Sequence, residues 1–331
     1  MNAGAPEQVR FVLDGAVRSV GPVDPTLTLL NYLRENERRC GTKEGCAEGD
    51  CGACTVVLGE LVNGRVRYRA VNACIVFLPA IDGKELITVE SLRGADGGLH
   101  PVQQAMVDCH GSQCGFCTPG FVMSLFALYQ AGEVPSRDQI DDCLAGNLCR
   151  CTGYRPIVAA AEQAFALPAV RPADSAAQLR SITRRDTLTL QYGGRRYFAP
   201  VTIDALAELL AQYPQAHLLA GGTDVGLWVT KQHRDLETVI YLGNVAGLND
   251  ISITADAIEL GAGVTYGDAQ AVLAEQFADF GEVIRRLGSV QIRNLGTIGG
   301  NIGNASPIGD TPPLLLALDA SLVLRRGTAQ R

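Results

Sequence analysis

The sequence lacks an excess of positive charge, a long apolar run and a signal-peptide pattern. Its 331 residues carry 35 acidic and 28 basic side chains, so the net charge is −7 and no basic surface for nucleic acid or anionic membranes is expected. No apolar stretch approaches the roughly 18 residues of a membrane span. The first residues, MNAGAPEQVR, do not form a basic-then-apolar leader. We therefore expect a cytoplasmic protein without nucleic-acid or membrane partners.

Histidine is scarce, with four residues in no motif, whereas cysteine is abundant, with eleven residues. A reducing compartment disfavours a disulfide framework, and an odd number of cysteines would leave one unpaired. Metal or redox ligation is the better explanation for so many thiols. The length exceeds one typical domain, so we expect two or three domains.

The first cysteine group lies in CGTKEGCAEGDCGACTVVLG, which begins at residue 40. Cys46, Cys51 and Cys54 have the spacing C-x4-C-x2-C, and Cys74 follows in AVNACIVFLPA. This is the plant-type spacing for a [2Fe–2S] cluster, in which a tight loop gives three thiolates and a distant cysteine gives the fourth. Zinc is the alternative, but structural zinc sites usually bring two close cysteine pairs. Cys40 falls outside the spacing and is interpreted as a structural thiol.

The segments around this group predict a small β-grasp domain over residues 8–92. VRFVLDGAVRSV reads as two strands joined by an Asp-Gly turn at 14–15, a strong hairpin signal. Apolar residues recur with helical period over 27–33, and strands with an Asn-Gly turn at 63–64 follow the cysteine loop.

The second cysteine group predicts a helical domain over residues 93–166. GSQCGFCTPG and LCRCTGYRP each place a cysteine pair before a helical run with an early proline, so each pair should lie at a helix N-terminus. Two such ends would aim free N–H groups at an anionic cluster. Two more helices complete the region. The cysteines of these pairs are Cys114, Cys117, Cys149 and Cys151.

Other residues of the helical domain are interpreted as structural. Cys109 and Cys143 fall on apolar helix faces and are expected to be small buried hydrophobes. His100 and His110 flank one helix and are expected to be solvated caps. Ser136 and a glutamine three residues later form a predicted capping box.

A plant-type cysteine loop followed by C-G-F-C-T-P-G and L-C-R-C-T-G-Y resembles the tandem [2Fe–2S] module of the xanthine oxidase family of molybdenum hydroxylases. The resemblance covers about residues 8–165 and implies eight cluster ligands. It also implies that the second cluster lies next to the molybdenum cofactor and that Gln113 contacts the molybdopterin. The implied ligands are Cys46, Cys51, Cys54 and Cys74, then Cys114, Cys117, Cys149 and Cys151.

The remaining sequence predicts a linker over 167–187 and a third domain over 188–331. LPAVRPADSAAQLRSITRRDT has weak periodicity and reads as exposed. LLAGGTDVG and TIGGNIGNASPIGD each contain a Gly-Gly turn, which can bind phosphate or can be an ordinary tight turn. The fingerprint G-x-G-x-x-G is absent, so a Rossmann domain is disfavoured.

These two segments resemble the FAD-contacting segments of the same family's flavin domain, which has the vanillyl-alcohol-oxidase type of fold. The resemblance implies an α+β domain that binds FAD. The family's flavin domain continues for a further subdomain, so this one is expected to be C-terminally incomplete. Trp228 is interpreted as helix packing. The implied cofactor contacts are Leu219, Ala220, Gly221, Gly222, Thr223, Asp224, Val225, Leu287, Thr297, Gly300, Asn301 and Asp310.

Clusters and flavin on one chain, in this order, favour a family member that oxidises hypoxanthine and xanthine to urate with NAD as acceptor. The resemblance implies that this chain transfers electrons and carries no catalytic residue, while a large partner subunit holds the molybdopterin. A dimer of such heterodimers is expected. One alternative is the same module in an aldehyde or N-heterocycle dehydrogenase. The other alternative is a protein-interaction domain that is stabilised by structural zinc and has no redox role; such a protein would be colourless.

Overall fold

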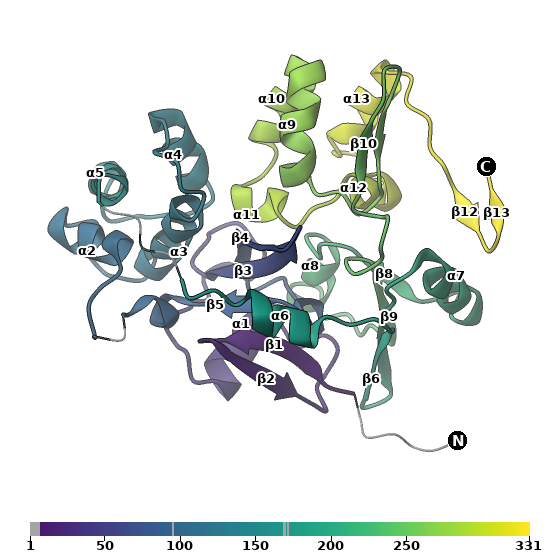
Figure 1. Cartoon of the computed structure of the whole chain (residues 1–331), viewed down its shortest axis with the longest axis horizontal. Coiled ribbons are helices and arrows are strands. Elements are labelled where there is room, and N and C mark those ends of the chain that lie inside the picture. Colours follow the sequence, from purple (N-terminus) through teal and green to yellow (C-terminus); the bar gives the residue numbers. More distant parts are fainter. Residues whose placement is uncertain (1–6, 95, 168–169, 171) are drawn as a thin grey trace.

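The structure is a computed structural model that describes residues 7–94, 96–167, 170 and 172–331. Three regions follow one another along the chain and pack together. Figure 1 shows the purple and blue N-terminal sheet in the middle, the helices α2 to α5 on one side, and the green and yellow C-terminal region on the other.

The N-terminal region is a five-stranded mixed sheet of order β2-β1-β5-β3-β4, in which β1 pairs parallel with β5. Both predicted turns are confirmed, since residues 14–15 join β1 to β2 and residues 63–64 join β3 to β4. The predicted helix is short and continues as a π-helix, Tyr32–Asn36. The bounds are β1 Val9–Leu13, β2 Ala16–Val20, α1 Leu29–Asn31, β3 Thr55–Val62, β4 Arg65–Asn72 and β5 Glu85–Ile87.

The second region consists of four helices: α2 Pro101–Asp108, α3 Thr118–Tyr129, α4 Arg137–Leu144 and α5 Arg155–Phe165. They pack around fully buried apolar side chains such as Phe121 and Ile157. The predicted capping box at Ser136 is present at the start of α4. His100 does cap α2, since its Nδ1 accepts from the Val102 N–H at 3.2 Å. It is buried, however, because the rings of Phe126 and Tyr129 cover it.

The segment predicted as an exposed linker differs from that expectation. Residues 168, 169 and 171 lie outside the described residues. Further on, helix α6 spans Ala176–Ile182 and buries Leu179 and Ile182 against Val12 of the first sheet. The sequence pattern was too short to show this helix, because α6 has only seven residues and buries three of them, Ala176, Leu179 and Ile182.

The C-terminal region contains a four-stranded sheet of order β6-β7-β9-β8, a hairpin of β10 and β11, and several helices. Residues 188–331 are therefore mixed α and β. The sheet strands are β6 Leu188–Tyr192, β7 Arg195–Ala199, β8 His217–Leu219 and β9 Thr238–Tyr241. The other elements are α7 Ile203–Gln212, α8 Val225–Thr230, β10 Ile251–Ile253, β11 Ile258–Leu260, α9 Tyr266–Gln276, α10 Ala278–Arg286, α11 Val290–Arg293, α12 Ile298–Asn304, α13 Thr311–Ala317, β12 Arg325–Arg326 and β13 Ala329–Gln330.

The C-terminal region packs tightly against the N-terminal sheet. One hydrophobic core contains buried residues of both regions, for example Phe77 and Leu78 with Tyr197 and Leu219. Polar contacts add to it, because Arg69 on β4 bonds Asp268 on α9 at 2.5 Å and Asn294 Nδ2 donates to the carbonyl of Ala70 at 2.9 Å. This packing brings the C-terminal glycine segments to the first cysteine loop.

Candidate functional site: two cysteine sets and a glycine-lined cavity

The first cysteine loop folds back so that backbone N–H groups point at a sulfur. The N–H groups of Cys51 and Glu48 donate to Cys46 Sγ at 3.3 and 3.5 Å. Gly52 has a φ of +68°, a conformation that favours glycine, and lies where the loop turns back toward β3. The loop is therefore preorganised to stabilise a thiolate at Cys46.

The four thiols of the first set lie together. Cys46 contacts Cys74 and Cys51, and Cys74 also contacts Cys54. The contact with Cys74 lowers the pKa of Cys46 to about 4, although burial opposes this shift. A separate contact with Cys74 lowers the pKa of Cys54, and the contacts with Cys46 and Cys54 together raise the pKa of Cys74. The close contacts among the four thiols fit the ligand set of one centre.

The second cysteine set lies in the two loops that precede α3 and α5. Cys114 Sγ and Cys151 Sγ are 3.6 Å apart, and Cys117 contacts Cys149. Cys117 is the N-terminal cap of α3, as the sequence predicted, whereas Cys149 and Cys151 lie a few residues before α5. The backbone of Phe116 is the main cause of the lowered pKa of Cys114. Burial opposes the thiolate of Cys149, but hydrogen bonds with Thr152, Cys151 and Cys117 together outweigh it, so the pKa of Cys149 is lowered.

The donor sets fit [2Fe–2S] clusters in their chemistry. Each set is four thiols without an imidazole or a carboxylate, which is what such a cluster takes. Gly45 passes Cys51 so closely that a Cβ there would lie 2.8 Å from the cysteine Sγ, so the backbone wraps tightly around the sulfurs. Over the described ranges no three His, Cys, Asp or Glu side chains surround a position for a single metal ion.

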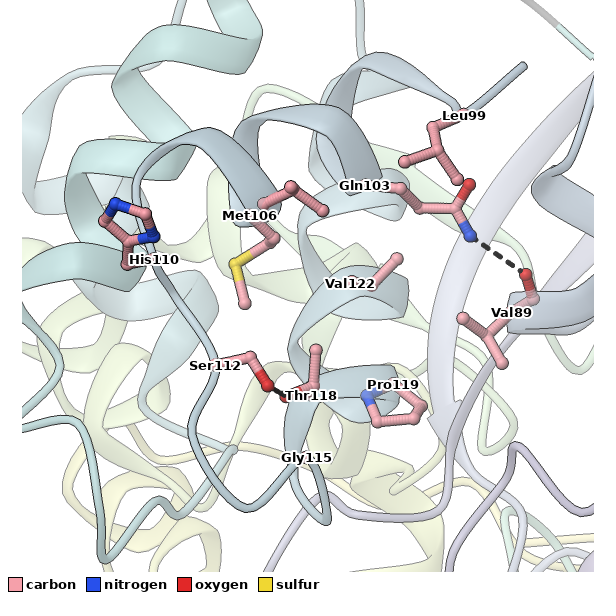
Figure 2. A pocket seen from close by; sticks show the side chains of 11 residues that line it. Val89, Leu99, Gln103, Met106, His110, Ser112, Gly115, Thr118, Pro119 and Val122 are labelled. Atoms are coloured by element: carbon pink, nitrogen blue, oxygen red, sulfur yellow. Dashed lines mark hydrogen bonds between the residues drawn. The ribbon is translucent and has the colours of Figure 1, made fainter.

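The second set lies at the surface, beside an open hollow of about 450 Å³ between α2 and α3. Figure 2 shows this hollow, with Met106 and Val122 on its walls and Gly115 of the second cysteine loop at its lower end. Ser112 accepts a hydrogen bond from Thr118 Oγ1 at 2.7 Å, which holds the loop to the start of α3. Predicted site residue Gln113 is exposed on the same loop.

The two predicted flavin segments lie together in the C-terminal region. LLAGGTDVG joins β8 to α8, as predicted. The second Gly-Gly pair is not a turn, because Gly299 and Gly300 lie in the first turn of α12, which is capped by Thr297. A Cβ on Gly221 would overlap the carbonyl of Leu295, just before α12, so only glycine permits this close approach.

A cavity of about 790 Å³ opens beside this contact. Of the predicted site residues, Ala220, Gly221 and Thr297 line it, together with Thr265 and Asn294. A cavity of this size, lined by glycine backbone, small polar groups and both acidic and basic side chains, fits a polar cofactor such as FAD.

The other predicted flavin contacts lie around this wall rather than in it. Leu219 and Gly222 line a small hollow on the side facing the first sheet. Asn301 accepts from Thr311 Oγ1 at 2.5 Å, which joins α12 to α13 and its capping residue Asp310. Thr223, Asp224 and Val225 lead into α8, and Leu287 ends α10. Trp228 packs against the core, as expected.

The flavin-segment loop touches the first cysteine loop directly. A Cβ on Gly226 would lie 2.7 Å from the carbonyl oxygen of Ile75, so α8 packs against the backbone of the residue that follows Cys74. Lys231 Nζ donates to the carbonyl of Cys46 at 2.7 Å, and Thr230 Oγ1 donates to that of Ala47 at 2.8 Å. No local signal in the sequence marked these residues, because their partners are more than 180 positions away.

The cysteine loops of the two sets also touch each other. The N–H of Leu148 donates to the carbonyl of Cys51 at 3.0 Å, which connects the residue before Cys149 to the first set. The structure thus brings three predicted sites into one row: second cysteine set, first cysteine set, and glycine-lined cavity.

Helices that could cross a membrane are not found over the described part of the chain.

The sequence matches three domain families. Residues 12–78 match a 2Fe-2S iron-sulfur cluster binding domain, residues 88–162 a [2Fe-2S] binding domain, and residues 190–331 the FAD binding domain in molybdopterin dehydrogenase. The chain therefore carries two [2Fe–2S] domains and a FAD-binding domain.

Curated relatives align with nearly all of the chain. Xanthine dehydrogenase of Drosophila pseudoobscura pseudoobscura is 34% identical over 371 residues, covering 96% of this chain and 28% of that protein. Aldehyde oxidase of Homo sapiens is 32% identical over 376 residues, with the same coverage, 96% and 28%. Among solved structures, quinoline 2-oxidoreductase from Pseudomonas putida 86 is 30% identical, covering 53% of this chain and 97% of that chain, with a TM-score of 0.42. The chain spans less than a third of the length of these curated relatives.

Proposed function

Because the chain belongs to the xanthine oxidase family of molybdenum hydroxylases, we propose that it is the iron–sulfur/FAD electron-transfer subunit of a xanthine dehydrogenase. Electrons from the oxidation of hypoxanthine and xanthine to urate would pass through the second and first cysteine sets to FAD and then to NAD. The order of the three sites in the structure supports this path. The proposal depends on two direct contacts: the hydrogen bond from Leu148 to Cys51 joins the two cysteine loops, and the packing of α8 on Ile75 joins the first cysteine set to the flavin segment.

The chain's own residues would hold the carriers and keep them close together. Cys46, Cys51, Cys54 and Cys74 would ligate the first cluster, and Cys114, Cys117, Cys149 and Cys151 the second. The wall formed by Ala220, Gly221 and Thr297 would hold FAD. When bound, the clusters carry single electrons and the flavin converts them to hydride transfer. No catalytic residue for hydroxylation is assigned to this chain.

The partner in this proposal is a large subunit that binds molybdopterin, arranged as a heterodimer and further as a dimer of heterodimers. Its docking face would be the surface of the second cysteine set. Cys114 and Cys151 are exposed there, and Phe116 and Leu148 expose large apolar side chains beside them. Gln113, on the same loop, would contact the molybdopterin. A reducing cytoplasmic location, which keeps the thiols available, is part of the proposal.

Aldehyde oxidase is nearly as similar to this chain as xanthine dehydrogenase, 32% against 34% identical. The second candidate is therefore the same electron-transfer role for an aldehyde or N-heterocycle hydroxylase. The large subunit selects the substrate, so the two candidates differ only in that partner.

Co-purification with the large subunit, followed by substrate-dependent bleaching of the clusters, tests the proposal. Xanthine and hypoxanthine should bleach the visible absorption of the complex, whereas an aldehyde such as benzaldehyde should not. The isolated chain should show two distinct [2Fe–2S] EPR signals on chemical reduction and no xanthine oxidation. A single EPR species, or zinc in place of iron, would contradict the electron-transfer role. Bleaching by the aldehyde alone would favour the second candidate.

A further inference from the structure

A glutamine of the C-terminal region lies fully buried between the two iron–sulfur domains. Gln291, on α11, is 0% exposed, although glutamine is usually found at the surface. Its neighbours come from the start of β3, from α3 and from the loop after α4. All three regions of the chain therefore meet at this side chain.

The Gln291 amide donates into a closed polar network. Its Nε2 lies 3.2 Å from Thr55 Oγ1, 3.0 Å from Ser124 Oγ and 3.1 Å from Asn147 Oδ1. Thr55 Oγ1 and Asn147 Nδ2 both donate to the carbonyl of Gly52, at 2.7 and 3.1 Å. Because an amide has only two N–H hydrogens, three acceptors share them, and the group is held from both iron–sulfur domains at once.

The other side of the amide is fixed by packing rather than by a hydrogen bond. Gln291 Oε1 is buried without a partner among the described residues, and a Cβ on Gly146 would overlap it. A buried carbonyl oxygen without a partner has lost its hydration, so the network on the Nε2 side must offset this desolvation cost. A buried polar group with this cost is expected where the position of the side chain is needed for function more than its contribution to stability.

The network sits on the backbone that joins the two cysteine sets. Gly52 follows Cys51, and Asn147 precedes Leu148, whose N–H donates to the carbonyl of Cys51 at 3.0 Å. Gln291 is thus held, through this network, next to both ends of the backbone hydrogen bond from Leu148 to Cys51.

We propose that Gln291 is a positioning residue that fixes the second cysteine loop relative to the first and so sets the coupling between the two clusters. The C-terminal, flavin-binding region would in this way control electron transfer between the clusters in addition to receiving the electrons. The inference rests on the proposed function, since it requires both loops to hold clusters.

The magnetic interaction between the two reduced clusters tests this role. In the full chain, Gln291→Met keeps the approximate volume but removes both donors, so iron content should stay at the wild-type value while the EPR line splitting shifts. Arg285→Met is the matched control. It breaks the 2.7 Å pair with Asp142, another contact between the C-terminal and helical regions, without touching a cysteine loop, and it should leave the splitting unchanged.

A smaller change covers the case in which Gln291→Met fails to fold. Ser124→Ala removes one of the three acceptors and should shift the splitting in a stable protein. The inference is overturned if either variant keeps its iron and also keeps the wild-type splitting, or if Arg285→Met shifts the splitting as much. Failure of the proposed function would look different, because the wild-type protein itself would then lack two interacting clusters.

Discussion

Asp268 holds the flavin-binding region to the first iron–sulfur domain, and its replacement by asparagine tests that attachment. The carboxylate on α9 bonds Arg69 at 2.5 Å and Arg67 at 2.8 Å on β4, and it accepts from Thr265 Oγ1 at 2.9 Å. These partners outweigh burial and lower the pKa of Asp268. Asp268→Asn keeps the shape and removes the charge.

The size of the effect follows from the exposure of the two arginines. Arg69 is 11% exposed, so its charge-assisted hydrogen bond is worth about 1.5–3 kcal/mol. Arg67 is 45% exposed, and its bond contributes about 0–1 kcal/mol because solvent screens it. We therefore expect Asp268→Asn to lower the free energy of unfolding by about 2 kcal/mol.

Urea unfolding followed by the fluorescence of the single tryptophan, Trp228, measures this loss in the C-terminal region. Because the folded pKa is lowered, the contribution of Asp268 is fully present above the ordinary Asp range and is lost only as the pH falls through the lowered pKa. The difference from wild type should thus stay constant above about pH 5. Asp256→Asn, at an exposed position, is the control. A loss within about 0.5 kcal/mol of that control would refute the reasoning.

Two further predictions concern the cysteines and a buried acid. Cys46→Ser and Cys149→Ser should each lose half of the iron, and the two variants should lose different EPR signals. Cys143→Ser should keep both signals, because Cys143 is buried and its Sγ donates to the carbonyl of Ser124 at 3.3 Å. Loss of a cluster in Cys143→Ser would show that the ligand sets are misassigned. Glu85 accepts a hydrogen bond from Ser175 Oγ at 2.5 Å, and burial raises the pKa of its carboxyl group. The charged form of Glu85 therefore destabilises the fold, and this loss of stability grows as the pH rises through the raised pKa. Glu85→Gln should raise the urea midpoint at alkaline pH and give little gain at acid pH; a gain that grows toward acid would contradict this sign.

Local patterns in the sequence were sufficient for much of the fold. The Asp-Gly and Asn-Gly turns, the capping box at Ser136 and the prolines that open α3 and α5 depend on neighbours within a few residues, and the structure has them all. The spacing of the cysteines within each group likewise indicates a loop that brings the thiols close together. The assignment of all eight as ligands remains a prediction.

Contacts between distant segments could not be predicted from the sequence. Gln291 and Lys231 acquire their roles from partners that lie in other domains, and no residue beside them marks this. The second Gly-Gly pair read as a turn because glycine disfavours helices, yet the Thr297 cap and packing against Ala262 place it in α12. His100 read as solvated because only its place at a helix end was visible.

The relay itself is tested most directly by closing the flavin cavity while both cysteine sets stay intact. Ala220→Trp places a large side chain on the cavity wall beside Gly221 and Thr297, and the iron content of the variant shows whether both cysteine sets still hold their clusters. In the complex with the large subunit, cluster bleaching by xanthine and NADH formation are followed side by side. We predict that xanthine still bleaches both clusters and that NADH no longer forms. NADH formation at the wild-type rate in the flavin-free variant would contradict the account.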